Sequence, residues 1–208
     1  MTSGVRLIRE GAEALEVPLS EDAGDALGAL VERLLRWNRK INLIGPCDET
    51  EAIDRHIHDG LGLLRTLDRP EVRAVTTEWT DIGAGAGLPG LVLAIARPDW
   101  RLRLVEPIGK KVAFAKEAAA ALGLDHVEVV QGRLEALETG SARGALSRAT
   151  FAPDEWVERA RDLVAPGGLI VATMGGDPVG AIVDAAWHVD RFTLPSSGAG
   201  RTTALLRA

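Results

Sequence analysis

The stretch that decides the fold reads Glu78-Trp-Thr-Asp-Ile-Gly-Ala-Gly-Ala-Gly-Leu-Pro-Gly90, and it leads through a helix-like run to Arg101-Leu-Arg-Leu-Val-Glu106. This order predicts a strand, a glycine-dense turn, a helix and a second strand, with an acidic residue closing each strand. Open α/β sheets hold adenosine-containing cofactors in this way, because glycines let the backbone approach a ligand closely. Glu106 follows the first glycine by about 20 residues, the interval at which a carboxylate meets ribose hydroxyls.

Two cofactors are compatible with this loop. Gly85 to Gly90 matches the dinucleotide fingerprint G-x-G-x-x-G, which places a pyrophosphate on a helix N-terminus. That match begins two residues late, however, because the first glycine after the strand is Gly83. Asp81-Ile-Gly83-x-Gly85-x-Gly87 instead resembles the cofactor loop of S-adenosylmethionine-dependent methyltransferases, whose ligand has no phosphate. A turn without any ligand would usually need only one or two glycines.

Length and composition indicate one sizeable globular domain with a small extension. The 208 residues include 46% hydrophobic and 26% charged residues, as in ordinary soluble proteins. We expect neither a membrane span nor a secretory signal, since no apolar run approaches the necessary length. Cys47 is the only cysteine, which fits a reducing, cytoplasmic location. The net charge of −6 argues against a broad nucleic-acid-coating surface but leaves room for a local basic patch.

The first part of the chain is predicted to be helical. An N-cap at Ser20 precedes apolar residues at helical spacing, namely Leu27, Leu30, Val31, Leu34, Leu35 and Ile41. Asp48-Glu-Thr-Glu51 has the form of a capping box, which opens a helix that continues to Leu64. Residues 68–71 predict a linker. We therefore divide the chain into an N-terminal helical extension and a second domain, residues 1–67 and 72–208.

The second domain alternates strands and helices. Strands are predicted near 78–82, 101–106, 127–131, 144–148 and 169–174, and helices near 88–96, 109–122, 154–164 and 179–186. This alternation implies parallel strands with right-handed crossovers. Two final strands, Trp187–Phe192 and Thr202–Leu206, have no helix between them and should be antiparallel. Ala165-Pro-Gly-Gly168 predicts a turn before the fifth strand, where methyltransferases commonly carry Pro-Gly-Gly. We expect an α/β, class I S-adenosylmethionine-dependent methyltransferase (Rossmann-like) fold with a mostly parallel seven-stranded sheet.

Several motifs together resemble one family. Arg36-Trp-Asn-Arg-Lys-Ile-Asn-Leu43, His56-Ile-His-Asp59 and Asp81–Gly90 are similar, in the same order, to blocks of the glucose-inhibited division protein B (GidB) family. Shorter blocks at Gly109–Lys111, Gly132–Glu135 and Ser147–Ala149 support the resemblance, which covers residues 25–208. It implies a bacterial enzyme that moves a methyl group from S-adenosyl-L-methionine to N7 of one guanine in 16S rRNA. The chain departs from the family pattern at Ile44, Gly60 and Met174, where Thr, Ser and Lys are usual.

The glycine-rich loop supplies the first candidate cofactor residues. Gly83, Gly85 and Gly87 would line the methionine tail, although turn geometry alone also explains them. Asp81 would order the loop or hold a water on the cofactor amine, and it could equally be a capping acid. Glu106 would bind the ribose hydroxyls, the alternative being a solvated acid at a strand end.

Four further residues complete the expected cofactor site. The family resemblance places Leu134 and Glu135 at the adenine, although both could simply begin a surface helix. Arg148, at the end of the fourth strand, could pair with the methionine carboxylate, since a guanidinium fork matches that group, or it could form a structural ion pair. Leu88 would form a wall of the pocket or pack in the core.

The chemistry of guanine N7 requires little of the protein. N7 has an in-plane lone pair and no proton, so attack on a sulfonium methyl needs positioning rather than a general base. We therefore expect no catalytic acid or base, and no metal, because the histidines and Cys47 lack ligand spacing. His56 and Asp59, one helical turn apart, predict a buried pair that packs the helices beside the pocket. A local RNA patch would draw on Arg36, Arg39, Lys40, Lys110 and Lys111.

Other functions remain compatible with the sequence. A methyltransferase of the same fold could act on another RNA or on a small molecule. An NAD-dependent oxidoreductase would use Gly85 to Gly90 instead. A non-catalytic RNA-binding assembly protein would keep the fold without the reaction. The expected partner is 16S rRNA or the small ribosomal subunit, and the expected state is a monomer.

Overall fold

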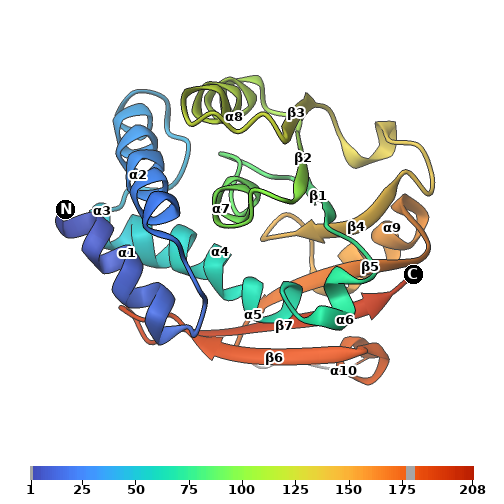
Figure 1. Ribbon diagram of the computed structural model, residues 1–208. Coiled ribbons are helices and arrows are strands. Elements are labelled where there is room, and N and C mark those ends of the chain that lie inside the picture. Colours follow the sequence, from blue (N-terminus) through green and yellow to red (C-terminus); the bar gives the residue numbers. More distant parts are fainter. Residues whose placement is uncertain (1, 177–180) are drawn as a thin grey trace.

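The structure, a computed structural model, describes residues 2–176 and 181–208. Its N-terminal part is helical, as predicted, with α1 at Ser3–Ala14 and α2 at Glu21–Ile41. Ser20 Oγ accepts a hydrogen bond from the Ala23 N–H at 3.2 Å, which confirms the expected N-cap of α2. Both helices lie on the left of Figure 1, where they cover the edge of the molecule next to the N-terminus.

A second helical run begins at the predicted capping box and is less regular than the sequence indicated. Asp48 and Glu51 cap each other's backbone N–H groups, and the run comprises α3 (Glu49–Ala52), a π-helix (Ile53–His58), α4 (Asp59–Gly62) and α5 (Leu64–Leu67). The expectation of one uniform helix was wrong because apolar residues four apart do not reveal where the winding widens. π-Turns of this kind are frequent at functional sites.

The segment expected to be a linker is tied to its surroundings. Pro70 begins a further helical turn, α6 (Pro70–Arg73), in the position where proline suits a helix start. Asp68 accepts hydrogen bonds from Arg73 Nη1 at 3.1 Å and from Arg97 Nε at 2.7 Å. Residues 68–71 are therefore partly helical, and Asp68 holds them to Arg97, which lies between the first and second strands of the sheet.

Seven strands form one sheet in the order β3-β2-β1-β4-β5-β7-β6. They are β1 (Glu78–Ile82), β2 (Arg101–Glu106), β3 (Val127–Gln131), β4 (Ala142–Ser147), β5 (Val164–Gly175), β6 (His188–Thr193) and β7 (Gly200–Arg207). β1 to β5 are parallel to one another, and β7 runs antiparallel to both β5 and β6. The expected seven-stranded methyltransferase sheet, with its antiparallel closing hairpin, is confirmed.

Helices cover both faces of the sheet. The connecting helices are α7 (Gly90–Ala96), α8 (Gly109–Ala121), a short 3-10 helix (Leu134–Ala136), α9 (Pro153–Leu163) and α10 (Ala181–Ala185). α7 and α8 lie on the same side as α2, whereas α9 packs on β4 and β5 from the other side (Figure 1). Residues 179 and 180 of the helix expected at 179–186 lie outside the described residues.

Two apolar clusters form the core, one on each face of the sheet. The larger joins the N-terminal helices, including Leu30 and Ile57, to Trp79, Trp100 and Phe114. The smaller surrounds Trp156, whose indole Nε1–H donates to the Val171 carbonyl at 2.8 Å. The N-terminal helices and one face of the sheet therefore share a single core. No helix among the described residues has the length and apolarity needed to cross a membrane.

The Pro-Gly-Gly stretch differs from its expected form. The register between β4 and β5 passes from Ala142↔Val164 directly to Gly144↔Leu169, so residues 165–168 bulge out within β5 instead of forming a turn before it. Gly167 adopts φ +78° there, a conformation that glycine permits at little cost. The cause is that α9 ends at Leu163 and the next residue already pairs with β4.

Candidate functional site

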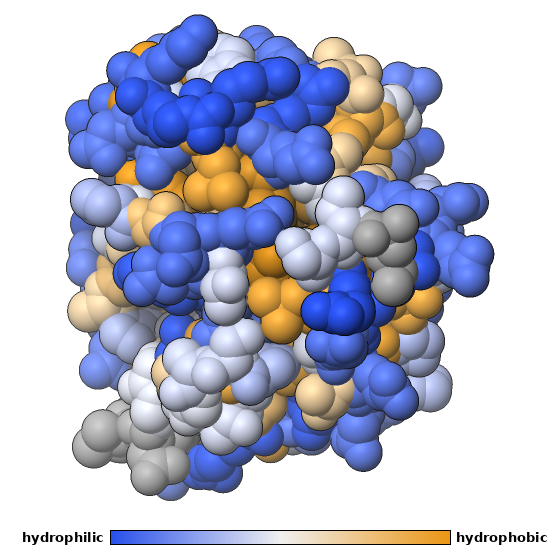
Figure 2. All heavy atoms as spheres, turned by 90° about the vertical axis from the view of Figure 1, so that its left-hand side faces the viewer, coloured by the Kyte–Doolittle hydropathy of each residue, from blue (hydrophilic) through white to orange (hydrophobic). Residues whose placement is uncertain are grey.

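A cavity of about 900 Å³ opens at the edge of the sheet where β1, β4 and β5 end. In open α/β sheets ligands bind outside the carboxyl ends of parallel strands. Its lining comes from the loop after α2, the π-helix, α4, the loop after β1, the start of α8, the segment after β4 with the start of α9, the end of β5, α10 and the start of β7. Figure 2 views the side toward which β4 points in Figure 1, and it shows a hollowed face where apolar side chains lie within a largely hydrophilic rim.

One side of the cavity is the glycine wall, by which we mean Gly83, Ala84, Gly85, Ala86 and Leu88. Gly83 has φ +69° and Gly85 has φ +59°. A Cβ on Gly83 would lie 2.2 Å from Thr150 Oγ1, whereas one on Gly85 would meet nothing closer than 4.0 Å, at Lys111 Nζ and the Gly83 carbonyl. Gly83 is therefore required by packing and conformation, while Gly85 leaves open space in the cavity.

Two buried carboxylates support the glycine wall from behind. Glu106 is 4% exposed, and its two oxygens accept hydrogen bonds from Gly85 N–H at 2.8 Å and Ile108 N–H at 2.9 Å. Asp81 is 1% exposed, and Oδ2 accepts from Gly90 N–H at 3.0 Å. Its Oδ1 has no hydrogen-bond partner among the described residues.

Burial dominates the electrostatics of Asp81. It raises the pKa of this carboxyl to about 7, against the opposing effects of the Gly90 hydrogen bond and the positive charge of Arg148. A buried carboxylate with one unpaired oxygen is costly. Asp81 therefore has an unused acceptor that a cationic hydrogen-bond donor would satisfy.

A second part of the lining is the arginine wall, defined as Arg55, His56, Asp59, Arg148 and Arg201. Asp59 bridges two guanidinium groups, because Oδ2 accepts from Arg148 Nη1 at 2.6 Å and Oδ1 accepts from Arg201 Nε at 2.8 Å. Arg148 Nη1 also donates to the Arg55 carbonyl of the π-helix at 2.9 Å. One carboxylate thus orders two cations, which leaves the wall with an excess of positive charge.

His56 is oriented by the same arginine. Arg148 Nη2 lies 3.2 Å from His56 Nδ1, and burial together with the charge of Arg148 lowers the pKa of His56 to about 4. His56 and Asp59 therefore face the same side, but Arg148 links them and they do not bond to each other. The imidazole is neutral at physiological pH.

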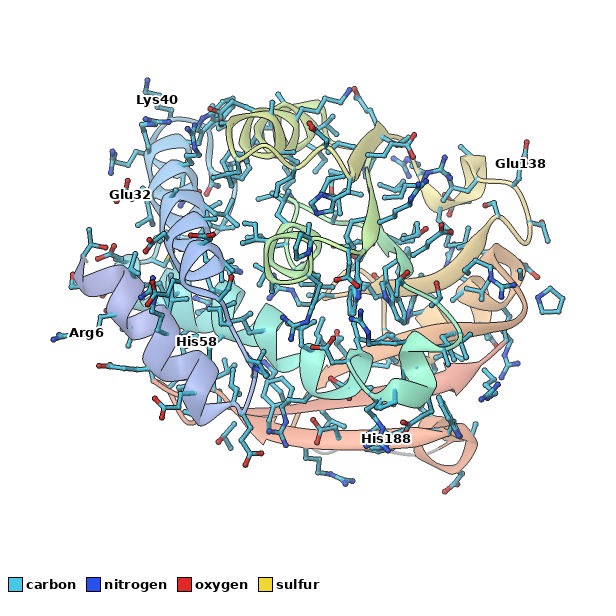
Figure 3. All side chains as sticks on the ribbon, viewed as in Figure 1. Arg6, Glu32, Lys40, His58, Glu138 and His188 are labelled. Carbon is cyan, nitrogen blue, oxygen red and sulfur yellow. The ribbon has the colours of Figure 1, made fainter. Side chains whose placement is uncertain are left out.

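The buried His–Asp pair is formed by other residues than the sequence indicated. His58 is fully buried and its Nδ1 lies 3.3 Å from Asp54 Oδ1, while its Nε2 lies 3.2 Å from the Leu7 carbonyl of α1 (Figure 3). Asp54 also accepts from the backbone N–H groups of Ser196 and Ser197. This buried pair joins the loop between β6 and β7 to the helices, whereas Asp59 attaches α4 to the sheet through Arg148 and Arg201.

The remaining expected cofactor residues lie outside the lining. Gly87, with φ +79°, packs beneath the loop, since a Cβ there would lie 2.7 Å from Leu91 Cδ1. Leu134 is half-buried against the smaller core cluster. Glu135 is exposed and accepts a hydrogen bond from Arg159 Nη1 at 2.9 Å. The structure thus brings Gly83, Gly85, Leu88 and Arg148 to the cavity, places Asp81, Gly87 and Glu106 behind it, and does not include Leu134 or Glu135 in the lining.

Asn38 shapes the rim. Its Oδ1 accepts from the backbone N–H groups of Leu43 and Ile44 at 2.7 and 2.9 Å, and Asn42 ends α2 with φ 49°. These two asparagines place Leu43 and Ile44 in the cavity lining. The Trp-Asn-x-x-x-Asn-Leu pattern is therefore explained by the fold of this loop.

The basic residues expected to contact RNA come from neighbouring helices. Lys110 Nζ, at the start of α8, donates to the Ile41 carbonyl at the end of α2, 2.9 Å away. Figure 3 shows Lys40 pointing outward from the same end of α2. Lys111 lines the cavity. The two segments therefore meet beside the site.

Sequence reasoning missed several residues of the lining. Arg55, Thr150 and Arg201 carried no local signal, because their positions depend on contacts between distant segments. Among the departures from the family pattern, Ile44 and Met174 line the cavity. Gly60 instead packs against α7, where a Cβ would lie 3.0 Å from Val92 Cβ. No group of His, Cys, Asp or Glu within residues 2–176 and 181–208 is arranged to hold a metal ion.

Comparisons with known proteins identify the family. The model of the family described as rRNA small subunit methyltransferase G (GidB) matches residues 24–186. Ribosomal RNA small subunit methyltransferase G of Burkholderia pseudomallei (strain 668) is 40% identical over 205 residues, which cover 94% of this chain and 87% of the relative.

Solved structures resemble this chain at the level of the fold. One, described as "Conversion of a Disulfide Bond into a Thioacetal Group during Echinomycin Biosynthesis", has a TM-score of 0.53 at 12% identity and covers 69% of this chain and 80% of that one. A SAM dependent methyltransferase from Aquifex aeolicus has a TM-score of 0.47 at 16% identity, covering 69% and 96%. The family match spans most of the chain and includes both walls up to β5, so this chain belongs to the GidB family of rRNA small subunit methyltransferases G.

Proposed function

We propose that this protein transfers the methyl group of S-adenosyl-L-methionine to N7 of one guanine in 16S rRNA. The observation that carries the proposal is the cavity itself, whose lining combines a glycine wall suited to the cofactor with an arginine wall suited to a polyanion. Family membership supports the rRNA substrate, and the antiparallel closing hairpin disfavours a dinucleotide-dependent oxidoreductase. We further propose that the protein acts in the cytoplasm as a monomer.

The residues around the glycine wall fit the cofactor. The unpaired Oδ1 of Asp81 would hold the cofactor's ammonium group directly or through a water, and the open space beside Gly85 would admit the methionine tail along Gly83, with Gly87 supporting the loop from beneath. Glu106 holds the loop and would accept ribose hydroxyls with its remaining lone pairs. Leu88 would pack against the cofactor, and Leu134 and Glu135 would flank the adenine.

Arg148 would bind the methionine carboxylate with the guanidinium hydrogens that remain available. Its Nη1 already donates to Asp59 and Arg55, and its Nη2 lies against His56. The guanidinium is consequently fixed before any ligand arrives. A preoriented donor of this kind loses little freedom on binding.

The protein would promote methyl transfer by positioning guanine N7 against the methyl group of the cofactor. The bound cofactor supplies an electrophilic methyl group on a sulfonium. Guanine N7 offers a lone pair and carries no proton, so the protein does not have to remove one. The walls would hold the base in line with the methyl group and exclude water. The carboxylate of Asp59, already shared by two arginines, is suited to ordering the wall rather than to proton transfer.

Charge supports an RNA substrate. The chain carries a net charge of −6, yet the described lining has two carboxylates, Asp59 and Asp154, against four cations, Arg55, Lys111, Arg148 and Arg201. The basic side chains at the junction of α2 and α8 would extend this positive region. We propose that the rRNA backbone crosses this junction while the target base enters the cavity.

Transfer of a labelled methyl group tests the function. Purified protein is incubated with labelled cofactor and either 16S rRNA or small subunits from a strain that lacks this protein, with a Gly85→Val variant, which fills the cavity, as control. We expect incorporation at one guanine N7 by the wild type only. Cofactor binding without transfer to any RNA would favour the assembly protein, and transfer elsewhere would favour another substrate.

A further inference from the structure

His56 has one free hydrogen-bonding group, and its identity is fixed. A guanidinium can only donate, so Arg148 Nη2, at 3.2 Å, requires His56 Nδ1 to be the acceptor. The ring proton must then be on Nε2. No hydrogen bond joins Nε2 to another residue within the described parts of the chain, and His56 lines the cavity.

The arginine wall also keeps this ring neutral. Protonation at Nδ1 would set two donors against each other beside Arg148 and Arg55, which agrees with the lowered pKa of His56. Asp59, the nearest carboxylate of the wall, is already shared by Arg148 and Arg201. His56 therefore presents a single neutral N–H donor of fixed direction to the cavity.

We propose that His56 selects guanine by donating a hydrogen bond from Nε2–H to O6 of the target base. This inference rests on the proposed function. It assigns His56 as a specificity-determining residue that contacts the base, and it leaves the transfer of the methyl group to positioning.

The Hoogsteen edge of the purine explains the choice. Guanine presents two acceptors there, O6 and N7, whereas adenine presents an N6 amino donor beside N7. A donor to O6 holds guanine with the N7 lone pair free for the methyl group. On adenine, Nε2–H would face the N6 amino group, which is also a donor. Adenine would therefore bind more weakly than guanine. A charged imidazolium would not keep this orientation, because its Nδ1–H would point at the guanidinium donor of Arg148.

The experiment pairs a change in the protein with a change in the base. The substrate is 16S rRNA assembled with guanine, inosine or 2-aminopurine at the target position. Inosine keeps O6 and N7, whereas 2-aminopurine keeps N7 and lacks O6. Initial rates of methyl transfer give kcat/KM for the wild type, His56→Ala, His56→Gln and the control His188→Ala, whose residue lies in β6 away from the cavity.

We expect the wild type to use inosine like guanine and to lose about 10–100-fold in kcat/KM on 2-aminopurine, the usual discrimination of one base-edge contact. On guanine, His56→Ala should lose a similar factor in kcat/KM relative to the wild type. On 2-aminopurine, it should match the wild type. Intrinsic differences in N7 reactivity cancel in this comparison because they affect both proteins equally. His56→Gln, whose side-chain amide keeps a donor, should recover part of the activity on guanine, and His188→Ala should match the wild type.

Three results would overturn the proposal. The first is equal use of guanine and 2-aminopurine by the wild type, a measurement that needs no variant to fold. The second is a loss in kcat/KM from His56→Ala that is as large on 2-aminopurine as on guanine, so that the effects of the two changes multiply. The third is a tenfold weaker affinity of His56→Ala for S-adenosylhomocysteine, measured by calorimetry, which would move His56 to the cofactor. A wild type that methylates neither guanine nor inosine would overturn the proposed function instead.

Discussion

The two walls of the cavity are built in different ways. The glycine wall comes from one short run of sequence, residues 83–88, and is held by backbone N–H groups bonded to Asp81 and Glu106. The arginine wall is assembled from the π-helix, α4, the segment after β4 and β7, and it is held by side chains that meet at Asp59. The first depends on backbone conformation and the second on one shared carboxylate.

This difference predicts different responses to substitution. Changes in the glycine wall should act mainly on the cofactor, because its supporting acids lie directly behind the loop. Changes in the arginine wall should first affect the attachment of the helices to the sheet, since Asp59 in α4 contacts arginines from β7 and from the end of β4. Four measurements separate the two walls, beginning with the largest expected effect.

Removal of the shared carboxylate should be the most damaging. Asp59→Ala leaves Arg148 and Arg201 close together without their common acceptor, and the side chain of Asp59 is 11% exposed. We expect the free energy of unfolding to fall by about 3 kcal/mol, at the low end for a buried pair because the arginines are partly solvated. Urea denaturation measures the change.

Asp154→Ala is the matched control for Asp59. It removes the same charge from the same cavity lining, at the exposed start of α9, where the expected cost is below about 1 kcal/mol. Equal losses in the two variants would show that Asp59 does not organise the arginine wall.

The glycine wall should respond through ligand binding. In Glu106→Gln only one side-chain oxygen remains to accept from Gly85 and Ile108, and the charge that would face the ribose is lost. We expect affinity for S-adenosylhomocysteine to weaken by about 1–3 kcal/mol, measured by calorimetry. Glu128→Gln on β3, where the acid pairs with exposed Arg103, should bind like the wild type. Unchanged affinity in Glu106→Gln would remove Glu106 from the cofactor site.

The two walls also differ in how far the sequence predicts them. Strand ends, the glycine loop and both acids follow from local patterns, because period-two strands, glycines and capping acids are encoded within a few residues. Arg201 and Asp59 lie 142 residues apart, and no local pattern connects them. The π-helix holds a related case, since His58 turns into the core and His56 lines the cavity. Apolar spacing cannot show that choice between neighbouring histidines.

Cofactor binding should depend on pH through Asp81. Its carboxyl has a pKa raised to about 7 by burial, and an ammonium group would favour the ionised form, so binding releases a proton. Affinity should therefore rise with pH, by up to about tenfold per unit below pH 7, and level off above it. It should fall again above about pH 8, where an α-amino group loses its proton. Calorimetry with S-adenosylhomocysteine from pH 5.5 to above pH 8 measures both limbs, and Asp81→Asn should abolish the rise. A wild-type affinity that stays constant below pH 7 would exclude Asp81 from the amine subsite.

The smallest effect should lie outside both walls, at the junction of α2 and α8. The double variant Arg39→Ala, Lys40→Ala removes two exposed cations from the end of α2. If both contact phosphates, the slope of the logarithm of RNA affinity against the logarithm of salt concentration should flatten by about 0.7–0.9 per contact. Affinity for S-adenosylhomocysteine should not change, because a small zwitterion does not reach this surface.

A second double variant, Arg101→Ala, Arg143→Ala, serves as control for the salt dependence. These residues are exposed at the amino-terminal ends of β2 and β4, opposite the edge that bears the cavity, so their loss should leave the slope as in the wild type. Equal flattening in both doubles would mean that RNA responds only to overall charge. An unaltered slope in Arg39→Ala, Lys40→Ala would confine RNA contacts to the cavity and the start of α8, and the arginine wall would then carry most of the electrostatic attraction.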